Sequence, residues 1–144
     1  MRIRYKLLTP TALPPAKMTK NSVGWDLSAD LKQPEILEPG DRAAIPTGIA
    51  VEIPEGYEGQ IRPRSGLALH RGLGVLNSPG TIDSDYRGEI RIIVINSSVE
   101  VLTIQPTMRI AQLVICPVVK VIFEESEALE DSERSQGGFG HTGE

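Results

Sequence analysis

MRIAQLVICPVVKVIF, residues 108–123, gives the strongest strand signal in the chain. Its β-branched and apolar side chains pack well on a pleated surface, and few charges interrupt it. In an extended strand Arg109, Ala111 and Leu113 share one face, and Ile110, Gln112 and Val114 share the other. The stretch therefore predicts a long strand that carries one amide, Gln112, in apolar company.

The segments before it repeat this pattern in shorter form. Helical periodicity is nearly absent, and 14 glycines and 11 prolines divide the chain into short pieces. One helical turn is expected at Ser65–His70. The other expected strands span residues 3–8, 43–54, 59–63, 89–96 and 101–106. This organisation predicts an all-β fold, either a sandwich or a barrel.

Composition limits the class of protein. The 144 residues suit one domain, and the 40% hydrophobic and 24% charged fractions are those of an ordinary globular protein. No run of about 18 apolar residues exists, so no membrane span is expected, and the first ten residues lack an apolar signal core. A single cysteine, Cys116, allows neither an internal disulfide nor a cysteine-based metal cluster. An unpaired thiol favours a reducing, cytoplasmic location.

The negative charge is concentrated late in the sequence. Residues 124–133, EESEALEDSE, hold six acids and no base. Setting these aside with Arg134 and Glu144 leaves 14 basic and 12 acidic residues in 1–123, a net charge of +2. We therefore expect a β domain over 1–123, then an acidic linker and a flexible, glycine-rich arm over 124–144. The mildly basic body suits a phosphate-bearing ligand but lacks the basic stripe of a nucleic-acid-binding protein.

Several familiar motifs fail on their context. GFGHTG, residues 138–143, fits the dinucleotide pattern, but no strand precedes it and no helix can follow. DSDYRG, residues 83–88, begins like a calcium loop but has Arg87 at a ligand position. The two histidines, His70 and His141, are too few for a zinc site, and the serine hydrolase motif G-x-S-x-G is missing from the sequence.

Five polar islands remain between the apolar strands. In SVGWDLSA, residues 22–29, Asp26 lies in apolar company, as a turn or ion-pair residue would. In RPRSGLA, residues 62–68, Arg64, Ser65 and Gly66 offer a guanidinium, a hydroxyl and an unobstructed N–H, which together bind phosphate oxygens at a strand-to-helix turn. An ordinary helix cap by Ser65 is the alternative.

The third island, GVLNSPGTIDSDYRGEI (74–90), is predicted to form a hairpin with polar residues at its mouth. Its exposed backbone groups can read the edge of a base, and Asp83 and Asp85 alternate, so both can face one side. Solvated turn acids are the alternative. The fourth island is RIAQL (109–113), in which the Gln112 amide needs either a structural or a ligand partner. The fifth is RSQGGFGHTGE (134–144), whose lone aromatic and freed N–H groups suit an arm that orders on a ligand.

Together the islands supply phosphate binding, a carboxylate for water activation, base readout and a closing arm. In order, GWDLSA, RPRSGLA, GTIDSDYRGEI, RIAQL and RSQGGFGHTG resemble the five motifs of the trimeric dUTP diphosphatase (dUTPase) family and span residues 22–143. The resemblance implies a jelly-roll-like β-clip fold and a homotrimer with shared active sites. It implies magnesium-dependent hydrolysis of dUTP to dUMP and pyrophosphate, which keeps uracil out of DNA and supplies dUMP for dTMP synthesis.

The resemblance also implies roles for individual residues. Asp83 is the catalytic carboxylate, which directs water at the α-phosphorus. Tyr86 lies against the deoxyribose and leaves no room for a 2′-hydroxyl. The resemblance implies contacts to uracil from Asn77, Gly80, Thr81 and Ile82, and contacts to the phosphates from Arg64, Ser65, Gly66 and Gln112. It implies a contact of Arg91 to the nucleotide, as in some relatives. The closing arm would contribute Arg134, Phe139, Gly140, His141 and Thr142.

Asp26 has two open roles, an ion pair with Arg109 or a hydrogen bond to a magnesium-bound water. Two positions depart from the family pattern: Ser135 stands where glycine is usual, and His141 stands where serine is frequent. Two rival interpretations are a dCTP deaminase on a related fold and a non-catalytic regulator that binds a partner through a dUTP-controlled arm. The third island and the glycine-rich arm favour the diphosphatase.

Overall fold

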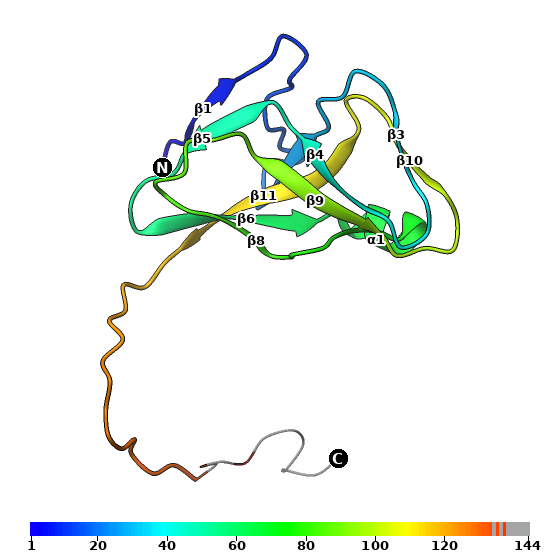
Figure 1. Ribbon diagram of the computed structural model, residues 1–144. Helices are drawn as coiled ribbons and strands as arrows, with labels where there is room; N and C mark the ends of the chain where they lie inside the picture. The colour runs from blue at the N-terminus through cyan, green and yellow to red at the C-terminus, as the bar shows by residue number, and fades with distance from the viewer. Residues whose placement is uncertain (134, 136, 138–144) are drawn as a thin grey trace.

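The computed structural model describes residues 1–133, 135 and 137, and the regular structure in these residues consists of eleven short strands and one short helix (Figure 1). The expected all-β fold is confirmed. No helix in the described part of the chain is long and apolar enough to cross a membrane. The elements are β1 (Arg4–Leu7), β2 (Trp25–Ser28), β3 (Glu35–Leu37), β4 (Arg42–Pro46), β5 (Ile49–Glu52), β6 (Tyr57–Pro63), α1 (Ser65–Arg71), β7 (Leu73–Val75), β8 (Gly80–Ile82), β9 (Arg91–Asn96), β10 (Leu102–Ile104) and β11 (Arg109–Pro117).

The largest sheet is four-stranded, in the order β2-β11-β6-β8. β11 lies inside it, antiparallel to both neighbours, so Gln112 is opposite Asp26 on β2 and Arg62 on β6. Three of the polar islands therefore meet on adjacent strands. A three-stranded sheet, β4-β9-β7, and the pairs β1-β5 and β10-β3 complete the fold.

The predicted alternation along β11 is wrong at its first residue. Arg109 pairs with Ser28 and Ala111 with Leu27, so the register against β2 shifts by one residue between them. Such a bulge turns the residue before it to the other face of the strand. Arg109 consequently shares its face with Gln112 and Asp26, rather than with Ala111.

The core is aliphatic, and it forms where the inward faces of the sheets meet. Strand β9 shows the alternation that this requires, with Ile92 and Val94 buried between neighbours that are more exposed. Fully buried side chains also come from β2, β4, β5, β10 and β11, among them Leu27, Ile45, Ile49, Ile104 and Ile110. This packed centre fixes the strands whose ends carry the polar islands.

Three expected elements differ in their limits. The strand expected over 43–54 divides into β4 and β5 at Gly48, which adopts a left-handed φ of 64°. The strand expected over 108–123 ends at Pro117, which has no N–H for the ladder. The hairpin expected over 74–90 is not formed, because β7 pairs with β9 whereas β8 pairs with β6. Strands β2, β3 and β7 were not expected.

Ile92→Ala should lower the free energy of unfolding by about 2–5 kcal/mol, because Ile92 is 1% exposed and its loss leaves a cavity in the core. Denaturant unfolding at matched protein concentration measures this change. Val99→Ala, at a 92% exposed site, is the control and should change stability by less than about 0.5 kcal/mol. Equal losses for the two variants would contradict the placement of the core.

Candidate active site

The Asp26 carboxylate lies between two guanidinium groups. Its Oδ2 is 3.2 Å from Nε of Arg64 and 3.1 Å from Nη1 of Arg109, and Asp26 is only 8% exposed. Nη1 of Arg64 also donates to the Arg109 carbonyl at 2.9 Å. One acid facing two bases leaves a net positive charge at the end of β6. The cluster can therefore attract an anion, and the predicted Asp26–Arg109 ion pair is present.

Gln112 secures the strand end beside this cluster. Its Nε2 donates to the Pro63 carbonyl at 2.9 Å, immediately before Arg64. On its other side Gly24 leaves room for the amide, since a Cβ at Gly24 would lie 2.0 Å from the Gln112 Oε1. The partner of this amide is thus structural. Gly24 is a residue that the sequence analysis missed, and its position before the Trp-Asp pair of the first island was the only signal for it.

Helix α1 starts directly after Arg64. Arg64 is the N-cap residue and makes no side-chain cap hydrogen bond, so the expected alternative of a Ser65 cap is not observed. The first helical hydrogen bond runs from the N–H of Ala68 to the Arg64 carbonyl, which leaves the preceding N–H groups without a helical acceptor. Ser65 and Gly66 are exposed, and nothing lies within 4 Å of a Cβ built on Gly66. Donors for an anion therefore cluster at this turn.

The third island lies along the other edge of the same sheet. Strand β8 pairs with β6 on one side and, among the described strands, with no other. Its second edge leaves backbone groups of Gly80–Ile82 without ladder partners. Asn77 lies against Gly80, because a Cβ on this glycine would be 3.1 Å from the Asn77 Nδ2. The Asn77 amide thus lies beside the unpaired edge of β8.

Asp83 follows β8 and is exposed. Within the described residues its carboxylate forms no hydrogen bond or ion pair, in contrast with Asp26. A turn connects it to Tyr86, whose N–H donates to the Asp83 carbonyl at 3.2 Å. The Tyr86 hydroxyl donates to the Glu89 carbonyl at 2.8 Å. Arg91, on β9, donates from Nη2 to the Ala44 carbonyl at 2.9 Å.

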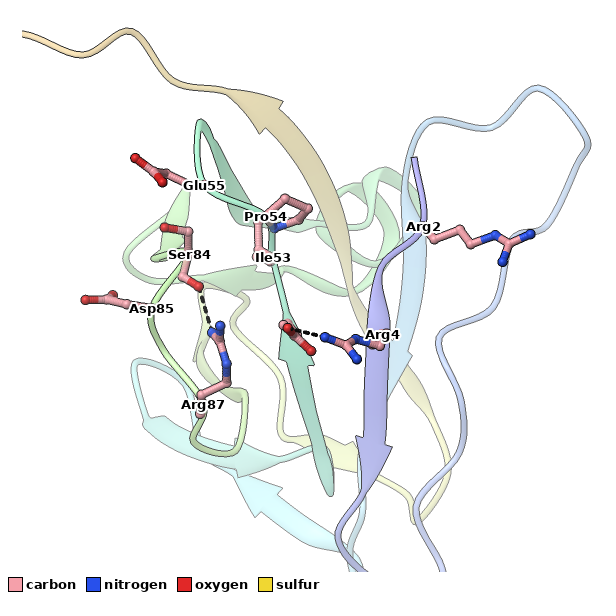
Figure 2. A pocket seen from close by; sticks show the side chains of 9 residues that line it. Arg2, Arg4, Ile53, Pro54, Glu55, Ser84, Asp85 and Arg87 are labelled. Carbon is pink, nitrogen blue, oxygen red and sulfur yellow. Dashed lines mark hydrogen bonds and ion pairs between the residues drawn. The ribbon is translucent and has the colours of Figure 1, made fainter.

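The side chain of Asp85 lies on a different surface. A hollow of about 530 Å³ lies between this loop and strands β1 and β5. Ser84, Asp85 and Arg87 line it on one side, and Arg2 and Arg4 on the other (Figure 2). Asp83 is not one of its lining residues. Arg87 contributes to the loop itself, since its Nη1 donates to the Ser84 carbonyl at 2.7 Å.

The Arg64 cluster and Asp83 lie at opposite ends of β6 and form the two halves of the candidate site. Gly80 pairs with Ile61 and Ile82 with Gly59, so Asp83 continues toward the first residue of β6, whereas Arg64 follows the last. Five residues separate Gly59 from Arg64, roughly 16 Å along an extended strand. One chain therefore does not bring the Asp83 carboxylate to the Arg64 cluster.

The predicted arm residues lie outside the described part of the chain. These are Arg134, Phe139, Gly140, His141 and Thr142. Within the described residues, no group of three or more His, Cys, Asp or Glu side chains is placed to hold a metal ion.

Comparison with known proteins identifies the family. The dUTPase family model matches residues 11–143. The deoxyuridine 5′-triphosphate nucleotidohydrolase of Chlamydia pneumoniae is 58% identical over 130 residues, which are 90% of this chain and 90% of that protein. The enzyme of the same name from Syntrophotalea carbinolica is 52% identical over 141 residues, covering 98% of this chain and 96% of that protein.

Solved structures give the same family. A mutant dUTPase of Staphylococcus bacteriophage 80alpha, determined with dUpNHpp, has a TM-score of 0.88 at 29% identity, covering 99% of this chain and 98% of that chain. A mutant dUTPase of phage phi11 of S. aureus, whose structure reveals the coordination of a structural Mg(II) ion, has a TM-score of 0.81 at 26% identity, covering 91% and 100%. The resemblance of the five islands is confirmed: the chain belongs to the dUTPase family.

Proposed function

We propose that this chain hydrolyses dUTP to dUMP and pyrophosphate, with Asp83 directing the attacking water. The chain is a nucleotidohydrolase acting on a phosphoanhydride bond, as its relatives are named. The observation that supports the assignment of Asp83 is its exposed carboxylate, which has no partner among the described residues and follows an unpaired strand edge. A carboxylate within hydrogen-bond reach of a water can orient it and accept its proton. That water attacks the α-phosphorus, and pyrophosphate leaves.

The Arg64 cluster is the proposed phosphate site. Arg64 and Arg109 together carry one positive charge more than Asp26 neutralises, and both guanidiniums are partly accessible, with side chains 27% and 42% exposed. Ser65 and Gly66 add a hydroxyl and N–H groups at the same turn. Gln112 acts indirectly, because it holds the Pro63 carbonyl and hence the start of this turn.

Base and sugar selection are assigned to the other end of β6. The free edge of Gly80–Ile82 and the Asn77 amide offer the donors and acceptors that a uracil edge requires. A cytosine would leave some of these groups unpaired, which costs affinity. The Tyr86 ring, 43% exposed beside Asp83, is the proposed barrier to a 2′-hydroxyl. The assignment of Arg91 to the nucleotide stays a prediction, since its guanidinium contacts the Ala44 carbonyl.

The residues present fit a magnesium ion held mainly by its substrate. The described part of the chain has no cluster of three potential ligands, and the buried Asp26 is already paired with two arginines. Mg²⁺ usually keeps several waters and binds phosphate oxygens rather than an all-protein cage. When bound to the triphosphate, the ion neutralises charge that develops on the phosphate oxygens. Asp26 as a contact to a magnesium-bound water stays a prediction.

We propose a homotrimer in which different subunits supply the two halves of each site. The separation of Arg64 from Asp83 along β6 supports this arrangement, since one subunit alone leaves both halves incomplete. The segment after β11 supports it too, because it extends away from the body (Figure 1) with Ile122 and Phe123 95% and 97% exposed. Apolar side chains at this exposure favour burial against another subunit. The arm beyond them would then close a site on a neighbouring subunit.

Asp83→Asn should reduce kcat for dUTP by at least about a hundredfold, because the amide cannot accept the proton of the water. Pyrophosphate release measures turnover, and binding of dUMP, measured calorimetrically, should stay close to that of the unmodified protein. Asp85→Asn is the matched control and should lose far less, since Asp85 lines the separate hollow of Figure 2. Near-normal turnover of Asp83→Asn would reject the assignment of the base.

Mixing two inactive variants tests whether the sites are shared. Asp83→Asn and Arg64→Gln, co-expressed with different affinity tags and purified as mixed oligomers, should recover activity, because some sites then combine an intact Asp83 with an intact Arg64. In each mixed trimer one of the three sites, roughly a third, combines both intact residues. A mixture no more active than its two parents would place each complete site within one chain.

Removal of residues 134–144 should preserve the oligomer but reduce dUTP turnover by at least about tenfold, because a closing segment excludes water and completes the site. Sedimentation analysis checks assembly, and pyrophosphate release checks turnover. A truncated chain with full activity would refute the role of the arm.

A further inference from the structure

Glu89 connects the substrate-facing loop to the body of the domain at two points. Its carboxylate Oε1 accepts a hydrogen bond from the Gly48 N–H at 2.8 Å, and its carbonyl accepts one from the Tyr86 hydroxyl at 2.8 Å. We propose that Glu89 is a positioning residue that sets the Tyr86 ring and thereby the selection of a deoxyribose over a ribose. The inference rests on the proposed role of Tyr86 and extends it to a residue that does not touch the substrate.

The Gly48 end of this connection is fixed. Gly48 has a left-handed φ of 64°, and a Cβ there would lie 2.5 Å from the Ala12 Cβ and 2.6 Å from the Asp30 Oδ2. The neighbouring Thr47 is fully buried and donates from Oγ1 to the Ile90 carbonyl at 2.7 Å. The Ile90 N–H in turn donates to the Ile49 carbonyl at 2.8 Å. The turn at 47–49 is therefore a rigid support for Glu89.

The Tyr86 end is equally close-fitting. The phenol lies over Gly88, where a Cβ would be 2.4 Å from the Tyr86 Oη and 2.6 Å from its Cζ. Only a glycine leaves space for the ring in this position. With the hydroxyl bound to the Glu89 carbonyl, one side of the ring is packed against backbone, while the residue stays 43% exposed on the outside.

A displacement of Tyr86 would also displace Asp83. The Tyr86 N–H donates to the Asp83 carbonyl, so the barrier to the 2′-hydroxyl and the catalytic carboxylate share one turn. A 2′-hydroxyl is excluded by shape, and small displacements of a positioned group cost much of its effect. Loss of the Glu89 carboxylate would leave the Gly48 N–H unpaired and free the loop that holds the ring. Selection should consequently weaken together with kcat.

The test compares Glu89→Ala with Glu89→Gln. The measured quantity is kcat/KM for dUTP divided by kcat/KM for UTP. Glu89→Ala should reduce this ratio by at least about tenfold, whereas Glu89→Gln keeps an acceptor oxygen for Gly48 and should stay within about threefold of the unmodified protein. Glu35→Ala removes a partly buried glutamate on β3, away from this loop, and should leave the ratio unchanged. A merely structural role of Glu89 would lower the melting temperature without changing the ratio.

Tyr86→Phe provides a second, independent variant. It keeps the ring and the Glu89–Gly48 bond but removes the hydroxyl that binds the Glu89 carbonyl, so its ratio should also fall. If Glu89→Ala does not fold, this variant decides the question, and an unchanged ratio for Tyr86→Phe then overturns the inference. A folded Glu89→Ala with an unchanged ratio overturns it directly. Two further results separate this inference from the proposals on which it rests. No dUTP turnover in the unmodified protein rejects the proposed function, and an unchanged ratio in Tyr86→Ala rejects the proposed role of Tyr86 and with it that of Glu89.

Discussion

The charge balance around Asp26 is the interaction on which the proposed phosphate site depends. A carboxylate that is 8% exposed is costly to bury unless it is paired, and here two guanidiniums approach the same oxygen. The pairing fixes Arg64 at the end of β6 and Arg109 at the start of β11. Because two bases meet one acid, the pairing also leaves a positive charge. One arrangement thus satisfies a buried acid and prepares a site for an anion.

Within one chain, the four-stranded sheet keeps Asp83 apart from the Arg64 cluster. The groups proposed to bind phosphate gather where β6 ends, while Asp83 and the strand edge proposed to read the base lie beside its first half. Strands are stiff, so no side-chain rotation closes a gap of roughly 16 Å. This separation is the reason for proposing an assembly of several copies, and the exposed apolar segment after Pro117 has the composition for an interface.

Close contacts with glycine hold both halves in place. Gly24 admits the Gln112 amide, which holds the Pro63 carbonyl before Arg64. Gly88 admits the Tyr86 ring, and Gly48 presents its N–H to Glu89. A side chain at Gly24 would displace the Gln112 amide and one at Gly88 the Tyr86 ring, whereas one at Gly48 would strike Ala12 and Asp30. The Glu89 carboxylate thus ties the end of the loop from Asp83 to Glu89 to the turn at Gly48, which lies far from it in the sequence.

The sequence by itself determined the all-β class, the short strands and the family, because these depend on local composition, turn residues and five short motifs in order. It also offered the ion pair of Asp26 with Arg109 as one of two roles, and the structure shows this pair. It did not determine that β8 pairs with β6 rather than β7, or that a bulge turns Arg109 to the face of Asp26. Nor did it reveal Gly24 or Glu89, whose partners are distant in the chain. Register and strand order follow from long-range packing of the core, and no local pattern of residues encodes them.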